Sequence, residues 1–190
     1  HVDSESSIQL LPPVDGKIEG LRFSSGGDHI YYTYRKDGET GSLNRVAMTG
    51  SATPRKIISL GEGGPASVSP DGRQISYVRM NETDGIGSLV IAGIDDGLER
   101  EILRHNSPDH VSPMSAPAWS PDGRSVACVT GNNGPEDRLK AVILDVKSAE
   151  VKGNYDLPWA SVRQVEWIGE RGLIFLADET NNELRNQLWF

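Results

Sequence analysis

The chain has 190 residues, 36% hydrophobic and 24% charged, a balance typical of a folded globular domain and not of a disordered segment. Its formal charge of −8 argues against nucleic acid as a partner, because an acidic surface repels the phosphate backbone. No run of 18 apolar residues occurs, so we expect no direct membrane insertion, while 21 glycines and 11 prolines favour short strands and turns over long helices.

The predicted strands, taken in chain order, form four similar units. Each unit opens with two β-type runs joined by a turn, at GLRFSSGGDHIYYTY (20–34), ASVSPDGRQISYV (66–78), PAWSPDGRSVACV (117–129) and QVEWIGERGLIFLA (164–177). Aligning the units on Phe23, Val68, Trp119 and Trp167 gives spacings of 45, 51 and 48 residues. Self-similarity at this period indicates a repeat architecture.

Later strands follow in the same order within each unit. A third run is expected at 41–48, 87–94, 140–146 and 186–190, and a fourth at 54–60, 99–104 and 150–155. The spacing of LEREILRHN (98–106) and NNELRNQL (181–188) also fits short helices, but their place in the repeat favours strands. Four antiparallel strands per unit, packed radially, predict an all-β fold, a β-propeller of four-stranded antiparallel blades.

The repeated turn SPDGR has a defined physical role. Proline sets φ for the first central residue of a type I turn, aspartate can bond the backbone, and glycine accepts the positive φ that closes the hairpin. The predicted structural turn residues are Ser69, Pro70, Asp71, Gly72, Ser120, Pro121, Asp122 and Gly123. SSGGD (24–28) and IGERG (168–172) depart from this motif in the first and last units.

VSPDGRQISYV and WSPDGRSVACV resemble the WD40-like (PD40) repeats of TolB-type six-bladed propellers, and the resemblance covers nearly the whole chain. A narrower likeness is to the propeller domain of bacterial eukaryotic-like serine/threonine protein kinases. It is carried by SIQLLPPVDGKIEGLRFSSGGDHIYYTYRKDGETGSLNRVAMTGSATPRKI, SAPAWSPDGRSVAC and NQLWF. The resemblance implies part of a six-bladed propeller, with blade units near 14–60, 61–104, 112–157 and 160–190, and residues 1–13 as the end of a preceding blade.

Four units, the last without its fourth strand, admit two interpretations. Either these residues are a fragment of a longer propeller, or SIQLLP (7–12) closes the last blade into a four-bladed ring. The kinase-linked resemblance favours the fragment. A fragment would expose blade faces and strand edges, so we expect self-association through the open blade ends.

No established catalytic motif occurs in the sequence: G-x-S-x-G, H-E-x-x-H, a P-loop and a kinase catalytic signature are all missing. We therefore expect no catalysis, cofactor or metal from these residues, although the resemblance implies a kinase in the full-length protein. His105 and His110 share a loop without a third ligand, which favours a polar surface loop. Cys128 is expected to be a small buried apolar residue, and Trp119 and Trp167 are expected to pack between blades.

The loops that follow the second strand of each unit are acidic, and in a propeller they share one face. This face would suit a cationic peptide, a cation or a basic protein patch; the alternative, which we prefer, is a set of solvated loops that maintain solubility. The candidate binding residues are Asp37, Glu39, Glu82, Asp84, Glu136, Asp137, Asp178 and Glu179.

These observations predict a non-catalytic propeller that binds a protein, peptide or other ligand as a sensor or scaffold. The resemblance implies the extracytoplasmic or periplasmic part of a bacterial signalling protein, tethered through a membrane span outside this sequence, such as a serine/threonine kinase. Two alternatives remain open. One is the accessory propeller of a prolyl-oligopeptidase-type peptidase, and the other is a free periplasmic TolB-like protein.

Overall fold

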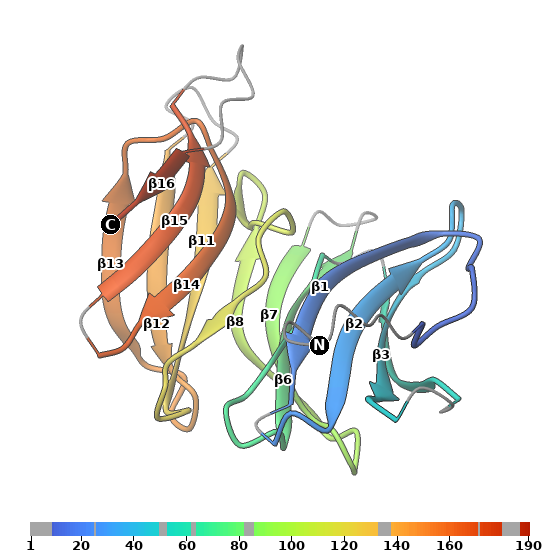
Figure 1. Ribbon diagram of the computed structural model, residues 1–190. Helices are drawn as coiled ribbons and strands as arrows, with labels where there is room; N and C mark the ends of the chain where they lie inside the picture. Colours follow the sequence, from blue (N-terminus) through green and yellow to red (C-terminus); the bar gives the residue numbers. More distant parts are fainter. Residues whose placement is uncertain are drawn as a thin grey trace.

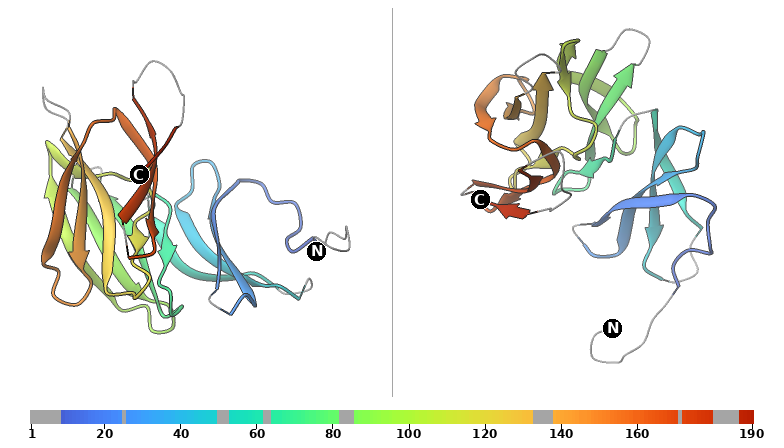
Figure 2. Two further views of the ribbon diagram at one scale, coloured as in Figure 1. Left: turned by 60° about the vertical axis from the view of Figure 1, so that its left-hand side comes forward. Right: turned by 90° about the horizontal axis from the view of Figure 1, so that it is seen from above.

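The computed structural model describes residues 9–24, 26–49, 53–61, 64–81, 86–132, 138–170, 172–179 and 187–190. In these residues the regular structure consists of β-strands, and the strands form four antiparallel sheets placed side by side around an axis (Figures 1 and 2). This arrangement confirms the predicted all-β propeller fold. Within the same ranges, no helix has the length and apolar character needed to cross a membrane.

The four sheets follow one another along the chain. The first two contain β1 (Lys17–Phe23), β2 (His29–Arg35), β3 (Gly41–Ala47) and β4 (Arg55–Gly61), then β5 (Ser67–Val68), β6 (Gln74–Asn81), β7 (Ile86–Gly93) and β8 (Glu99–Asn106). The last two contain β9 (Asp109–Val111), β10 (Ala118–Trp119), β11 (Ser125–Asn132), β12 (Leu139–Asp145) and β13 (Val151–Leu157), then β14 (Ser161–Ile168), β15 (Gly172–Asp178) and β16 (Gln187–Trp189). The segment around 99–106 is therefore a strand, as the repeat predicted; residues 181–186 lie outside the described ranges.

Central strands are buried on both faces because each sheet stacks on its neighbours. On β6 the four consecutive residues 75–78 are all buried, so the alternation of a half-exposed strand is lost there. Outer strands such as β13 remain mostly exposed. Three apolar clusters fill the spaces between successive sheets, and Cys128 is buried in the one between the second and third, as expected.

Two tryptophans connect successive sheets by the same contact. The indole Nε1 of Trp119 donates a hydrogen bond to the backbone oxygen of Ser67 at 3.3 Å, and that of Trp167 donates to the backbone oxygen of Ala118 at 3.0 Å. Each bond runs from the innermost strand of one sheet to the innermost strand of the sheet before it. The expected role of both side chains in packing between blades is therefore confirmed.

The two SPDGR turns are built around their serines. Ser69 Oγ donates to Asp71 Oδ1 at 2.6 Å and accepts from the backbone N–H of Gln74 at 2.9 Å, while Gly72 has φ +71°. Ser120, Asp122 and Ser125 repeat these contacts at the same distances, and Gly123 has φ +69°. A side chain would strain either glycine, which explains the residue type at the left-handed position.

The first sheet reaches the same turn with a different sequence. Ser24 Oγ donates to Asp28 Oδ1 at 2.7 Å and accepts from the backbone N–H of His29 at 3.0 Å. The aspartate now follows the glycine instead of preceding it, yet it bonds the same serine oxygen. The departure in SSGGD therefore keeps the serine contact, although Ser25 itself lies outside the described residues.

We expect the double variant Asp71→Asn/Asp122→Asn to reduce the fall in the free energy of unfolding that occurs as the pH is lowered below neutral. The serine hydroxyls hold the pKa of both carboxyls below the ordinary 3.8, followed by the backbone N–H groups of Arg73 and Arg124. Their contribution is present above pH 3.8 and is lost as the pH falls through the lower folded-state pKa. Because both side chains are near solvent, the loss at pH 7 should stay below about 1 kcal/mol per turn.

Urea unfolding at a series of pH values from about 2 to about 7, roughly the range over which carboxyl groups titrate, would measure this change. Asp95→Asn is the matched control, since it removes an exposed carboxylate outside the serine turns. Equal acid limbs in the double variant and in the wild-type chain would contradict the expectation.

The first and last sheets retain uncovered apolar side chains. Phe23 at the end of β1 is 68% exposed and Phe190 after β16 is 82% exposed. An ion pair between Arg22 of β1 and Glu166 of β14 connects these two sheets across the axis. The apolar sides of both nevertheless face solvent, which is the condition under which we expect association.

Candidate functional site

One side of the propeller collects the loops that follow the second strands and the connections between sheets (Figure 1). We call this side the loop face; among described residues it consists of 36–40, 64–66, 107–117, 138, 158–161 and 179. The opposite side carries the SPDGR turns and the turns after the third strands. Antiparallel strands alternate in direction, so every second hairpin must open on the same side.

Asp37 and Glu39 lie exposed in the loop-face turn of the first sheet. Lys36 Nζ lies 4.0 Å from Glu39 Oε1 and 3.4 Å from Asp15 Oδ2, so part of this negative charge is balanced locally. Glu179 is exposed on the loop face at the fourth sheet. Four further candidates from the sequence lie outside the described residues: Glu82, Asp84, Glu136 and Asp137.

Asp178 differs from the other acidic candidates because it is only 2% exposed. Ser161 Oγ donates to its Oδ2 at 3.0 Å, and Arg163 Nε lies 3.7 Å from the same oxygen. Its Oδ1 is buried and has no hydrogen-bond partner in the protein. This carboxylate therefore holds Ser161 and Arg163 in position from inside the fold.

Arg163 and Ser161 line a pocket of about 240 Å³ at the loop face, where the third and fourth sheets meet. The connector before β10 forms the other wall, and its His110 has a buried Nδ1 without a hydrogen-bond partner. The full lining comprises His110, Ser112, Met114, Leu139, Ala160, Ser161, Val162 and Arg163. Sequence reasoning missed Ser112 and Arg163, because no motif marks them and only the contact between sheets brings them together.

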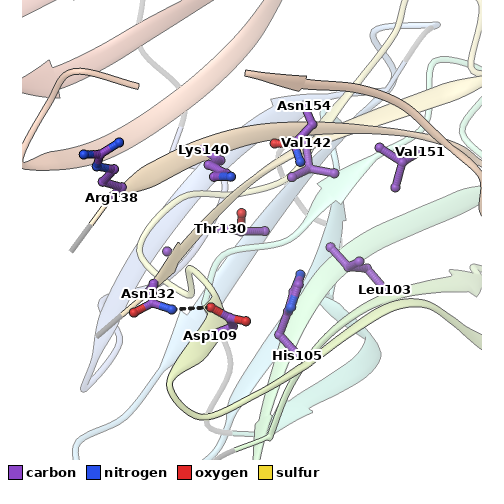
Figure 3. Close-up of a pocket in the computed structure, with 11 residues that line it drawn as sticks. Leu103, His105, Asp109, Thr130, Asn132, Arg138, Lys140, Val142, Val151 and Asn154 are labelled. Atoms are coloured by element: carbon purple, nitrogen blue, oxygen red, sulfur yellow. Dashed lines mark hydrogen bonds between the residues drawn. The ribbon is translucent and has the colours of Figure 1, made fainter. Parts of the chain in front are cut away.

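A second pocket of about 240 Å³ lies between the second and third sheets (Figure 3). The expectation that His105 and His110 share a polar surface loop is wrong, because His105 lies on β8 and His110 lies on β9 with its Nδ1 buried. His105 lines this pocket and His110 lines the other one. Basic and amide side chains stand around an apolar floor in this second pocket. Its lining comprises Leu103, His105, Asp109, Thr130, Gly131, Asn132, Arg138, Lys140, Val142, Val151 and Asn154.

The side chains around both pockets offer hydrogen bonds and ion pairs. Burial raises the pKa of the Cys128 thiol to about 12, so this sulfur stays protonated near neutral pH and is a poor nucleophile. Among the described residues, no three His, Cys, Asp or Glu side chains are grouped so as to hold a metal ion. The arrangement therefore suits binding of polar groups.

No protein-family model matches the chain. Solved structures with a similar fold include the β-propeller domain of the trilobed protease from Pyrococcus furiosus, with 19% identity and a TM-score of 0.61 over 85% of this chain and 48% of that one. A putative TolB from Agrobacterium tumefaciens has 19% identity and a TM-score of 0.63, over 92% of this chain and 57% of that one.

An acylaminoacyl peptidase from Pyrococcus horikoshii has 13% identity and a TM-score of 0.63, over 84% of this chain and 28% of that one. The chain thus spans between about a quarter and three fifths of the length of these proteins. At such identities the likeness concerns the fold alone. The chain has the β-propeller fold that is also found in TolB-like proteins and in the propeller domains of peptidases.

Proposed function

We propose that this chain is a non-catalytic propeller that binds a protein or peptide partner through its loop face. The observation that carries the proposal is the position of Asp37, Glu39 and Glu179, which are exposed on the same face of the first and last sheets. The net charge of −8 adds a long-range attraction for a cationic partner. The partner class is therefore a basic peptide or a basic protein patch.

A charge-matched pair of triple variants tests this proposal. Asp37→Asn/Glu39→Gln/Glu179→Gln removes three exposed carboxylates from the loop face, and Asp95→Asn/Glu150→Gln/Glu170→Gln removes three from the opposite side. The probe is a fluorescein-labelled octalysine peptide, with anisotropy measured over a salt series. We expect about five-fold weaker binding and a shallower salt dependence for the loop-face variant, and less than about two-fold for its control.

Equal weakening in both triple variants would mean that only net charge matters, and the loop face would lose its proposed role. Unchanged binding in the loop-face variant would have the same consequence.

The placement in a larger protein is also part of the proposal. Residues 7–57, 115–128 and 186–190 resemble the propellers of bacterial serine/threonine kinases. This resemblance supports the proposal that the chain is the extracytoplasmic part of a bacterial, membrane-tethered signalling protein such as a kinase of this type. The flanking sequence in the full reading frame tests this: a kinase domain and a membrane span upstream would support it. A leader peptide directly before the propeller would instead support a free periplasmic TolB-like protein.

A second candidate is the accessory propeller of a prolyl-oligopeptidase-type peptidase. The similarity to the trilobed protease and acylaminoacyl peptidase propellers favours it. A hydrolase domain carrying G-x-S-x-G downstream in the reading frame would support this candidate over the signalling role.

We also propose that isolated copies of this chain associate through their uncovered end sheets. Leu21 and Phe23 on β1, and Leu188 and Phe190 at the other end, present exposed apolar surface. Sedimentation velocity should show an apparent mass that rises with concentration and falls in Phe23→Ser/Phe190→Ser. A monomer at all concentrations would contradict this and favour ring closure.

A further inference from the structure

The pocket between the second and third sheets has a composition that the loop-face proposal does not use. Basic groups, one carboxylate, amides and apolar side chains all line a space of about 240 Å³. This volume is below the usual range for drug-sized ligands and suits a small metabolite. A ligand that engages all of these groups must carry an anionic group, a cationic group and an apolar part.

The register of the third sheet explains why the polar side chains converge. Thr130 of β11 pairs with Lys140 of β12, and Asn132 pairs with Asp109 of β9. Because residues two apart on a strand share a face, and paired residues do too, these four side chains lie on one side of the sheet. Val142 pairs with Asn154 of β13 and belongs to the same side.

The added strand β9 brings the carboxylate to this pocket. Among the described sheets, only the third has a strand in addition to the four of the repeat. This strand, β9, pairs with β11 and places Asp109 next to Asn132. Asn132 Nδ2 donates to Asp109 Oδ1 at 2.5 Å, which orients the carboxylate in the pocket wall (Figure 3).

The cationic groups come from the third sheet, where Lys140 lies on β12 and Arg138 directly precedes it (Figure 3). The imidazole of His105 on β8 of the second sheet lines the opposite wall. Lys140 Nζ also lies 3.6 Å from Asp156 Oδ1, a carboxylate with a 72% exposed side chain that therefore competes weakly in solvent. Leu103, Val142 and Val151 complete the lining with apolar surface.

We propose that this pocket binds a free α-amino acid with a short branched apolar side chain. Its carboxylate would bond to Lys140, with Arg138 adding positive charge and the His105 ring offering a further hydrogen bond, and its ammonium group would bond to Asp109. Its side chain would lie against the valines and the leucine. This ligand class matches the one carboxylate, the basic groups and the apolar floor at once. The inference goes beyond the proposed function and does not depend on the loop face.

The experiment compares L-leucine with two analogues that each lack one charge, 4-methylpentanoate and 3-methylbutylamine. Binding is followed by the amide NMR resonances of Gly131 and Asn132 during titration. Lys140→Gln should weaken leucine and 4-methylpentanoate about five-fold or more, and Asp109→Asn should weaken leucine and 3-methylbutylamine to a similar extent. Lys56→Gln/Lys147→Gln, which removes two exposed lysines outside the pocket, should bind leucine like the wild-type chain.

Three results would overturn the proposal. Leucine that causes no saturable change at Gly131 and Asn132 would exclude the site. If 4-methylpentanoate bound as tightly as leucine, the pocket would be an anion site that does not recognise the ammonium group. Leucine binding that is unchanged in both pocket variants, with native spectra retained, would place the ligand elsewhere. The loop-face triple variant should bind leucine normally, so failure here is distinguishable from failure of the proposed function.

Discussion

Trp119→Ala should lower the free energy of unfolding by about 3–5 kcal/mol, the range for removing a large aromatic side chain from a packed interior. Trp119 is only 8% exposed and belongs to the apolar cluster between the second and third sheets. The substitution leaves a cavity there and removes the donor for the Ser67 carbonyl. Urea unfolding monitored by far-UV circular dichroism would measure the loss.

Two further variants separate the causes of this loss. Trp119→Phe keeps most of the packing but removes the indole donor and part of the ring volume, so it should cost about 1–2 kcal/mol. Trp167→Ala removes the equivalent side chain one sheet later, but Trp167 is only partly buried and borders a pocket, so about half the loss of Trp119→Ala is expected. Equal losses from the two alanine variants would contradict the packing argument.

Tyr77→Ala should cost a further large amount, again about 3–5 kcal/mol, at the junction of the first and second sheets. Tyr77 is fully buried and packs with residues of both sheets. Its hydroxyl donates to Glu99 Oε1 at 2.6 Å, and the Arg79 guanidinium lies 5.5 Å from the ring centre. The alanine variant would lose the packing and leave Glu99 and Arg79 without this partner.

Tyr77→Phe isolates the hydroxyl and adds a signature at high pH. Burial, and then the bond to Glu99, raise the pKa of Tyr77 above its ordinary value of 10.0. Stability from this group is complete below pH 10 and is lost as the pH rises through the higher folded-state pKa, because only the unfolded chain ionises. The phenylalanine variant should lose about 1–2 kcal/mol at pH 7 and show a shallower alkaline decline.

Tyr155→Phe is the control for this profile, since it removes the hydroxyl of a tyrosine that is 57% exposed. An alkaline limb in Tyr77→Phe that matches the wild-type chain would show that the hydroxyl does not carry the effect.

Local patterns predicted the strands and turns because they depend on residues close together in the chain. The serine of SPDGR bonds the aspartate side chain and the glycine N–H within five residues, so the turn could be predicted without tertiary information. The same holds for β8, whose helix-like spacing was outweighed by its position in the repeat. The strand β9 escaped prediction because three residues, Asp109–Val111, carry too little pattern and acquire their pairing only from β11.

The acidic candidates show the limit of reasoning from composition. The sequence treats Asp37 and Asp178 alike, as residues of equivalent loops, but Asp178 is the last residue of β15. The structure exposes the first and buries the second against Ser161 and Arg163. A buried carboxylate needs cationic or hydroxyl partners. For Asp178 these partners are Ser161 and Arg163 on the neighbouring strand β14, which are distant from it in the sequence.

The sequence alone determined the repeating four-stranded unit, its turns and the packing role of its tryptophans, since these follow from short-range bonding and from hydrophobic periodicity. Only the tertiary structure decided which side chains share a cavity. The pockets at the two sheet junctions join residues from separate strands, up to some 50 positions apart in the chain. Stacking and register bring those residues together, and both depend on contacts that no local stretch of sequence contains.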